Sequence, residues 1–181
     1  MKSAVMTNSR PAIRIRPYTR DDADVMLEAV DESRVELNRW MPWCEPGYGR
    51  ADALEWIEMT IVGREKGTLF DFAIVDGHGR YFGGAGINQI RAAEGVANVG
   101  YWVRSSATGA GIAVAAARQV IDWGIANTRL NRFEIVAAVE NRRSQRVAEK
   151  LGAVRDAVLR KRLLVDGIAV DAVLYSVLRP D

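Results

Sequence analysis

Residues 101–113 read Tyr101-Trp102-Val103-Arg104-Ser105-Ser106-Ala107-Thr108-Gly109-Ala110-Gly111-Ile112-Ala113, and this stretch is the most informative part of the sequence. The pattern predicts a strand that ends, a turn with glycines, and a long apolar helix that runs to about Ala126. Gly109 and Gly111 let the backbone approach a bulky ligand, because glycine has no Cβ to collide with it. A helix start also presents unpaired N–H groups and a positive dipole end. Together these features predict a site for phosphate oxygens.

Two common phosphate-binding motifs do not fit these residues. A P-loop requires a lysine after its second glycine, whereas Ile112 and Ala113 follow Gly111. A dinucleotide-binding fold requires Gly-x-Gly-x-x-Gly, and the third glycine is missing here. A helix start that happens to contain two glycines is an equally simple interpretation, so the surrounding sequence has to decide.

The surrounding residues resemble a known family. The segment Gly100–Val103 followed by Thr108–Ala113 is similar to the acetyl-CoA-binding motif of the GCN5-related N-acetyltransferases, which runs Gln/Arg-x-x-Gly-x-Gly/Ala. Three further segments resemble the RimJ/RimL-like branch, whose enzymes acetylate ribosomal-protein N-termini: Leu37–Trp43, Leu130–Ile135 and Val139–Gly152. The matches keep their order along nearly the whole chain. The sequence is therefore identified as a member of this family and branch.

The resemblance implies an α+β fold with three layers, α/β/α, and a mixed, mostly antiparallel central sheet. The strands through Tyr101 and Val136 would splay apart and form a V-shaped cleft for acyl-CoA. The pantetheine arm would lie there like an added strand, and the pyrophosphate would bind the six N–H groups from Thr108 to Ala113. The residues expected to contact acetyl-CoA are Tyr101, Trp102, Val103, Thr108, Gly109, Ala110, Gly111, Ile112, Ala113 and Asn141.

Composition limits the class of protein. With 181 residues, we expect a loose tail at residues 1–11 and a single domain at residues 12–181. The net charge of +2 argues against stable nucleic-acid binding. The lone Cys44 fits a reducing compartment, and neither a membrane span nor a signal peptide is visible. We therefore expect a soluble cytoplasmic protein, monomer or homodimer, without a metal, since its one histidine, His78, has no ligand cluster around it.

Local patterns predict several individual elements. Asp52 would open the second helix, and Asn141 would cap a helix that ends at Leu151. The apolar run Phe133–Val139 predicts a central strand covered on both faces. Asp166-Gly167 predicts the turn of a hairpin near the end of the chain. The polar residues of the glycine-turn helix form one narrow stripe: Arg118, Gln119 and Asp122.

Ser144 is the candidate general acid. Amide formation requires a neutral amine, a backbone N–H for the oxyanion and a proton for the departing CoA thiolate. Many family members use a tyrosine further along the helix after Asn141, but that position is Ala148 here, whereas the ribosomal-protein branch offers a serine at position 144. Asn141 would contact the pantetheine amide or cap the helix. Ser144 could equally be a serine that bonds its own helix backbone.

The general base is harder to assign from the sequence. Many relatives carry a glutamate where this chain has Asn98. Glu140 and Asp171 are possible substitutes, although both are also typical surface charges. An α-amine titrates near about 7.7–8.0 and needs little help from a base, so proton removal through water alone is a further alternative.

The acceptor groove is expected to involve the first helices and their loop. Trp40, Trp43 and Tyr48 would line it, because aromatic residues suit an extended chain or a flat ligand, or they would anchor the core instead. The resemblance favours a protein N-terminal α-amine as acceptor. The alternatives are a small-molecule amine, such as an antibiotic or a polyamine, and a non-catalytic acyl-CoA-binding module.

Overall fold

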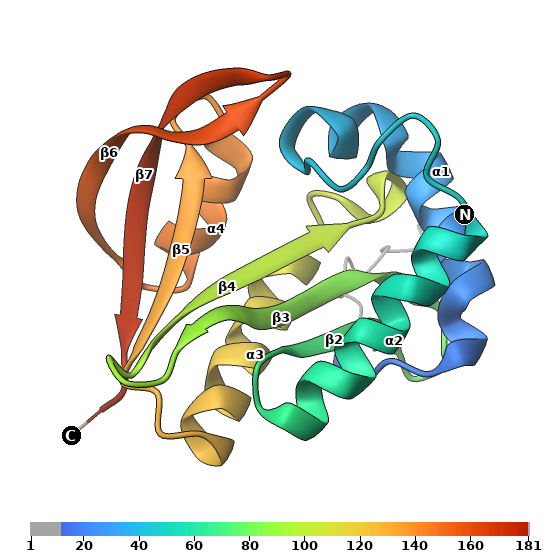
Figure 1. The fold of residues 1–181 in the computed structure, drawn as a ribbon, viewed down its shortest axis with the longest axis horizontal. Helices are drawn as coiled ribbons and strands as arrows, with labels where there is room; N and C mark the ends of the chain where they lie inside the picture. The colour runs from blue at the N-terminus through green and yellow to red at the C-terminus, as the bar shows by residue number, and fades with distance from the viewer. Residues whose placement is uncertain (1–11, 181) are drawn as a thin grey trace, which may run out of the picture.

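The fold is built on one twisted sheet, seen in the computed structural model, which describes residues 12–180 (Figure 1). The predicted tail at residues 1–11 lies outside the described residues. Within the described range, seven strands pair in the order β1-β2-β3-β4-β5-β7-β6. Their bounds are β1 Ile13–Pro17, β2 Phe70–Asp76, β3 Tyr81–Arg91, β4 Val96–Val103, β5 Arg132–Ala138, β6 Val154–Val165 and β7 Ile168–Leu178.

Helices cover both faces of the sheet, as the three-layer prediction requires. The helices are α1 (Ala23–Trp40), α2 (Arg50–Lys66), α3 (Ile112–Asn127) and α4 (Arg142–Lys150), with short 3-10 turns at Arg20–Asp22 (η1) and Ser105–Ala107 (η2). One apolar core lies between the sheet and α3 with α4, and a second lies between the sheet and α1 with α2. Along β2, Phe72 and Ile74 enter the first core, whereas Ala73 and Val75 enter the second.

The strands β4 and β5 form the one parallel pair of this sheet, and they separate after three residue pairs. Pairing ends at Asn98 and Glu134, although β4 continues to Val103 and β5 to Ala138. Figure 1 shows the two strands diverging while each keeps its other neighbour, β3 or β7. The predicted mixed, mostly antiparallel sheet with a V-shaped opening is therefore confirmed.

The strand β5 corrects one expectation. Its apolar run predicted burial on both faces, but burial alternates from Phe133 to Ala137: Phe133, Ile135 and Ala137 are buried, whereas Val136 is only partly buried, and Ala138 at the end is buried again. The cause is the divergence from β4, which leaves the second half of β5 facing a cavity. A run of small and branched apolar residues fits such a half-covered strand as well as a fully covered one.

Turn and cap residues mostly act where the sequence places them. Asp166 and Gly167 form a two-residue hairpin turn with φ of 51° and 73°, the positive values that this turn requires. Asn141 caps α4, since its Oδ1 accepts the Ser144 N–H at 3.1 Å. The second helix begins at Arg50 instead of Asp52, because Asp52 caps it from inside by accepting the Gly49 N–H at 2.8 Å.

Gln119 on α3 binds the edge strand β1. Its Oε1 accepts the Ile15 N–H and its Nε2 donates to the Ile13 carbonyl, both at 3.0 Å. The side-chain amide thus acts as one more rung of the sheet on a strand whose outer edge has no strand partner in the described range. At Gln119, the predicted polar stripe of α3 therefore makes a structural contact with β1.

Candidate functional site

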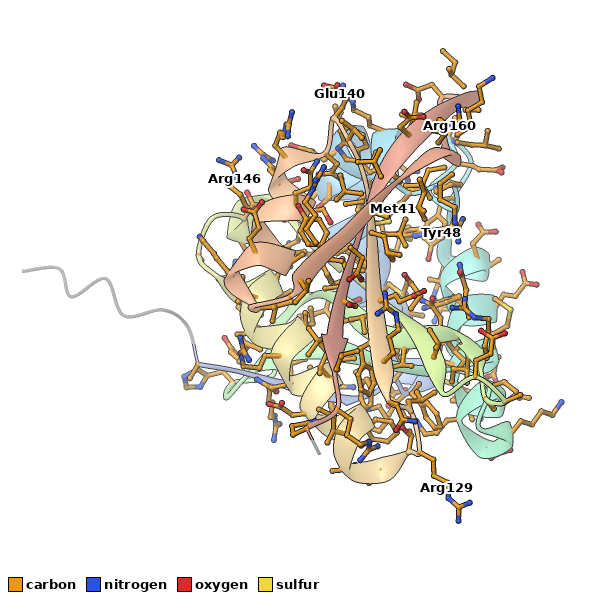
Figure 2. The ribbon with its side chains drawn as sticks, turned by 90° about the vertical axis from the view of Figure 1, so that its left-hand side faces the viewer. Met41, Tyr48, Arg129, Glu140, Arg146 and Arg160 are labelled. Carbon is orange, nitrogen blue, oxygen red and sulfur yellow. The ribbon has the colours of Figure 1, made fainter. Side chains whose placement is uncertain are left out.

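A cavity of about 750 Å³ opens where β4 and β5 diverge. Its floor is the sheet from β2 to β5, and its rim comes from α2, the loop between α1 and α2, the start of α4 and the end of β6. Figure 2 shows Met41 and Tyr48 of that loop beside the β6–β7 hairpin. Segments far apart in the sequence therefore meet around a single concave site.

At one end, the cleft between β4 and β5 leads to the start of α3. Gly109 and Gly111 have φ of 81° and 82°, the left-handed region that favours glycine, and a Cβ on Gly109 would meet open space. Among the described residues, the N–H groups from Gly109 to Ala113 have no recorded intramolecular acceptor. The Thr108 N–H, by contrast, donates to the Ser105 carbonyl at 3.2 Å. Five of the six predicted donors are thus free, and the Thr108 N–H is not one of them.

The free edge of β4 lies in the cleft. Tyr101, Trp102 and Val103 pair with β3 along one edge, and their other edge has lost β5. An exposed strand edge accepts an extended chain as if it were another strand. Together with the N–H groups of the glycine turn, this edge fits an elongated ligand that ends in a pyrophosphate.

Tyr101 and Ser144 meet across the V. The Tyr101 hydroxyl donates to the Ser144 carbonyl at 3.2 Å and lies 3.1 Å from the Ser144 Oγ. Burial raises the pKa of Tyr101 to about 12, so its hydroxyl stays protonated over the physiological range. The contact joins β4 to the first turn of α4, and Ser144 and Asn141 both line the cavity. The structure therefore brings the predicted acid, the predicted cap and the cleft strand together.

Gln145 is a positioning residue that sequence reasoning missed. It is buried, and its Nε2 donates to the carbonyls of Ala138 and Val139 at 3.2 and 2.7 Å. These bonds tie α4 to the end of β5 and hold Ser144 at the cleft. Ala148, at the position where many relatives carry a tyrosine, is fully buried in the core.

Aromatic side chains form the wall away from α4. Trp43 packs against Tyr48 and Trp102, with ring centroids 5.4 and 5.9 Å apart, and Trp40 also lines the cavity. Tyr48 is 9% exposed, and its hydroxyl is buried without a hydrogen-bond partner among the described residues. The three residues predicted for the acceptor groove thus share one cavity, and the Tyr48 hydroxyl is unsatisfied there.

Within residues 12–180, the charged residues that line the cavity are all carboxylates. They are Glu45, Asp52, Glu55 and Asp71, and no lysine, arginine or histidine of that range lines the cavity. A site with this charge favours a cationic occupant. The loop by itself contributes one glutamate, so the acidic character could not be seen from the loop sequence.

Asp71 is the carboxylate that the sequence interpretation overlooked. It lies on β2, is partly buried, and burial raises its pKa to about 7 against the opposing effects of the Phe72 N–H and Arg64. The substitutes considered from the sequence are elsewhere. Glu140 is exposed at the outer surface (Figure 2), and Asp171 accepts the Lys161 N–H at 2.9 Å; neither lines the cavity. The available signal was a charged residue inside the otherwise apolar run Phe70–Val75.

Asn98 occupies the position where many relatives carry a glutamate, and it is paired. Its Nδ2 donates to the Asn88 Oδ1 at 2.8 Å, and both amides line the cavity. An amide pair cannot take up a proton at neutral pH. Asn98 therefore does not supply a basic group to the cavity.

Known proteins that resemble this chain agree with the geometry of the site. The family model described as acetyltransferase (GNAT) domain matches residues 12–154. The chain belongs to this family. It is accordingly an N-acetyltransferase, and acetyl-CoA is the cosubstrate of this family.

Individual relatives agree with the branch that the sequence predicted. A protein of Bacillus subtilis strain 168, named "Putative ribosomal N-acetyltransferase YdaF", is 29% identical over 92% of this chain and 91% of its own length. The structure of Mycobacterium smegmatis RimJ in complex with CoA-disulfide superposes with a TM-score of 0.85 at 26% identity, over 93% of this chain and 83% of that one. Microcin C7 self immunity acetyltransferase MccE, in complex with acetyl-CoA and AMP, has the same fold, with a TM-score of 0.85 at 22% identity and 94% coverage of each chain.

The described residues contain neither a metal-site cluster nor a membrane-spanning helix. No group of three histidine, cysteine or acidic side chains in that range has the arrangement of a metal site. No helix in the same part of the chain is both long and apolar enough to cross a membrane.

Proposed function

We propose that this protein transfers the acetyl group of acetyl-CoA to the α-amine of a protein N-terminus. The observation that carries the proposal is that one cavity extends from Ser144 at the cleft to a part lined by aromatic and acidic side chains. This part is called the acidic chamber and is lined by Trp40, Trp43, Tyr48, Glu45, Asp52, Glu55 and Asp71. A free N-terminus is a cation followed by an extended chain, and the chamber offers negative charge and flat aromatic walls for both features. The ribosomal-protein branch of the family favours the same acceptor.

The cosubstrate is assigned to the glycine turn and the free edge of β4. The N–H groups from Gly109 to Ala113 would hold the pyrophosphate, and the backbone of Tyr101 to Val103 would bond the pantetheine arm. When bound there, acetyl-CoA supplies a thioester whose carbonyl carbon is open to attack by an amine. Asn141, at the tip of α4, would contact the pantetheine through the part of its amide that does not cap the helix.

Ser144 is assigned the role of general acid. Its Oγ lies at the cleft, 3.1 Å from the Tyr101 hydroxyl, so a proton given to the departing sulfur can be replaced along a hydrogen bond. A serine hydroxyl is by itself a weak acid, and a second hydroxyl within bonding distance stabilises the charge that it takes on. A backbone N–H near Val103 would stabilise the oxyanion.

A small-molecule amine is the second candidate acceptor. The four carboxylates around the cavity favour this alternative specifically, because a polyamine carries several positive charges, whereas an N-terminus has one. The cavity volume of about 750 Å³ also suits a molecule of that size. A cytoplasmic location, predicted from the cysteine content, remains a prediction.

The test is acetyl transfer to a mixed panel of amines, detected by mass. The panel contains peptides with free α-amines, lysine peptides with blocked N-termini, polyamines and aminoglycosides. Selective labelling of α-amines is the expected result. Labelling of polyamines alone would overturn the protein acceptor in favour of the second candidate, and labelling of blocked lysine peptides would overturn both.

A further inference from the structure

We propose that Asp71 binds the ammonium group of the acceptor in the acidic chamber and removes the proton that this group must lose before it attacks. This inference rests on the proposed N-acetyltransferase function and adds the base that the sequence does not reveal. It concerns a strand, β2, that does not touch the free edge of β4.

The sheet register places Asp71 in line with the reaction cleft. Asp71 pairs with Gly86 on β3, and Gly86 pairs with Gly100 on β4. Directly paired residues project from the same face of a sheet. That face is the α1–α2 side, since Ala73 and Val75, two and four residues beyond Asp71, pack into the core on that side. Two strand spacings, about 10 Å, separate Asp71 from the Gly100 backbone.

Gly86 and Gly100 leave open space above the sheet between Asp71 and β4. A Cβ on Gly86 would lie 2.5 Å from the Asp71 Oδ1, and a Cβ on Gly100 would lie 3.2 Å from the Asn88 Nδ2. Side chains at either position would therefore fill the space between the carboxylate and β4. With glycine at both, an amine group can lie over the sheet between Asp71 and the cleft, and Asp71 and Gly100 line the same cavity as Ser144.

The carboxylate is not engaged by a cation of the protein itself. Among the described residues it forms no salt bridge, and the bond recorded for its Oδ1 is the 2.9 Å contact with the Phe72 N–H. Arg64 of α2 lies nearby, but its Nη2 donates to the Asp71 backbone carbonyl at 2.8 Å, and its guanidinium packs 4.5 Å from the Phe72 ring centre. A partly buried carboxylate without a cationic partner is poised for a ligand.

The groups around Asp71 determine the direction in which its pKa is shifted. Burial is the largest influence and raises its pKa to about 7, while the Phe72 N–H and Arg64 oppose this rise. The other titratable groups close enough to interact with its charge are Tyr18 and Tyr81, whose hydroxyls bond to each other, and Glu55 of α2 lines the same cavity; none of them adds positive charge. A base whose pKa lies near neutrality accepts a proton and releases it again within each cycle.

Asp71, Ser144, Tyr101 and water account for every proton that moves during the transfer. Asp71 takes one proton from the ammonium, and the neutral nitrogen attacks the thioester carbonyl carbon. The new C–N bond forms, the C–S bond breaks, and sulfur leaves with its electron pair and takes up a proton from the Ser144 hydroxyl. The nitrogen loses its excess proton, which restores Ser144 through Tyr101 and water. Asp71 then returns its proton to solvent, so one proton is released for each ammonium acetylated.

The test compares the wild type with Asp71→Asn, which removes the charge at nearly constant volume. With a peptide acceptor whose α-amine titrates at about 7.7–8.0, wild-type kcat/KM should already rise with pH through about 7. In Asp71→Asn, kcat/KM should be about 10²-fold lower at neutral pH, and the rise should move toward the pKa of the free amine. Asp71→Glu should restore part of the rise near neutrality. An unchanged pH profile in Asp71→Asn would overturn the proposal.

Two matched controls separate the base from general charge effects. Glu55→Gln removes a carboxylate from the same cavity, and its effect should be confined to KM for a cationic acceptor, without moving the pH profile. Glu65→Gln removes a charge next to Arg64 on an exposed position outside the cavity and should leave both parameters as in the wild type. A shifted pH profile in Glu55→Gln equal to that in Asp71→Asn would assign the effect to the field of the cavity and overturn the role of Asp71.

Measurements without turnover give independent results. Calorimetric binding of the acceptor amine to the protein without cosubstrate should weaken at least about tenfold in Asp71→Asn, the effect of removing a charge-assisted hydrogen bond. Because the folded pKa of Asp71 is raised, its ionisation opposes folding between about pH 4 and 7. Asp71→Asn should therefore melt at least about 2 °C higher at pH 8 than the wild type, and this difference should shrink at pH 5. A lower melting temperature with unchanged amine binding would assign Asp71 a structural role.

Failure of the proposed function gives a different result. If the wild type acetylates no amine but its melting temperature rises with acetyl-CoA, the acceptor assignment has failed. If the wild type acetylates amines and Asp71→Asn does so with the same pH profile, the function stands and the role of Asp71 has failed.

Discussion

The hydroxyl groups of Tyr101 and Ser144 lie 3.1 Å apart and join β4 to α4 across the cleft. Tyr101 also donates to the Ser144 carbonyl at 3.2 Å, so the first turn of α4 is fixed against the cleft strand at two points. Many family members place a tyrosine on the helix itself. In this chain that position is the buried Ala148, and a tyrosine hydroxyl reaches the cleft from the opposite strand. The Tyr101–Ser144 pair thus presents a tyrosine hydroxyl to the cleft from β4, whereas those relatives present one from the helix.

Ser144→Ala should lower kcat about 10²-fold, the size of a general-acid contribution, because the departing sulfur loses its proton donor. Steady-state kinetics would measure this, and KM for acetyl-CoA should change little. Tyr101→Phe is the matched variant, since it removes only the second hydroxyl, and its loss should be smaller, about tenfold. Equal kcat in Ser144→Ala and the wild type would remove Ser144 from the mechanism.

Gly111→Glu should abolish acetyl-CoA binding, because it places bulk and negative charge at the start of α3, where phosphate oxygens would bind. Titration calorimetry with acetyl-CoA measures the effect directly. Gly111→Asn is the control, since asparagine tolerates the φ of 82° found there and adds no charge. Comparable losses in both variants would point to backbone strain instead of phosphate repulsion.

Asp22 should make the fold acid-sensitive. Burial acts to raise the pKa of its carboxyl, but hydrogen bonds from Arg16 at 2.6 and 2.7 Å and from the Thr19 N–H act more strongly, and the pKa is lowered. A lowered folded pKa gives stability that is present above the unfolded value and is lost as the pH falls through the folded value.

The free energy of unfolding should therefore fall as the pH drops below about 4, and Asp22→Asn should show less of this fall. At neutral pH the variant should be about 2 kcal/mol less stable, because two charge-assisted bonds weaken. Urea denaturation at both pH values measures the difference. The same dependence on pH in both proteins would show that other carboxyls cause the acid sensitivity.

Gln119→Ala should destabilise the protein by about 1–2 kcal/mol, because it removes two hydrogen bonds from the edge strand β1. Hydrogen exchange should show faster exchange of the Ile15 amide in particular. Asp122→Ala, an exposed position on the same helix, is the control and should change stability by less than about 0.5 kcal/mol. Unchanged protection of Ile15 would mean that β1 does not depend on the side-chain amide.

Much of the fold could be predicted from short patterns. The hairpin at Asp166-Gly167, the cap at Asn141 and the glycine turn before α3 depend on residues next to one another, so their chemistry is visible in the sequence. The start of α2 was two residues off, since Asp52 acts as a cap from within the helix. The burial of β5 was overestimated, because an apolar run does not show where its neighbour strand departs.

The family, the glycine turn before α3 and the place of Ser144 after its cap could all be predicted from the sequence, because each is visible in short runs of neighbouring residues. The tertiary structure alone decided the acidic chamber, the Tyr101–Ser144 contact and the position of Asp71. Asp71, Gly86 and Gly100 come from three strands, and only the strand register aligns them on one face. Register depends on packing between distant segments, and a linear pattern with period two does not reveal it.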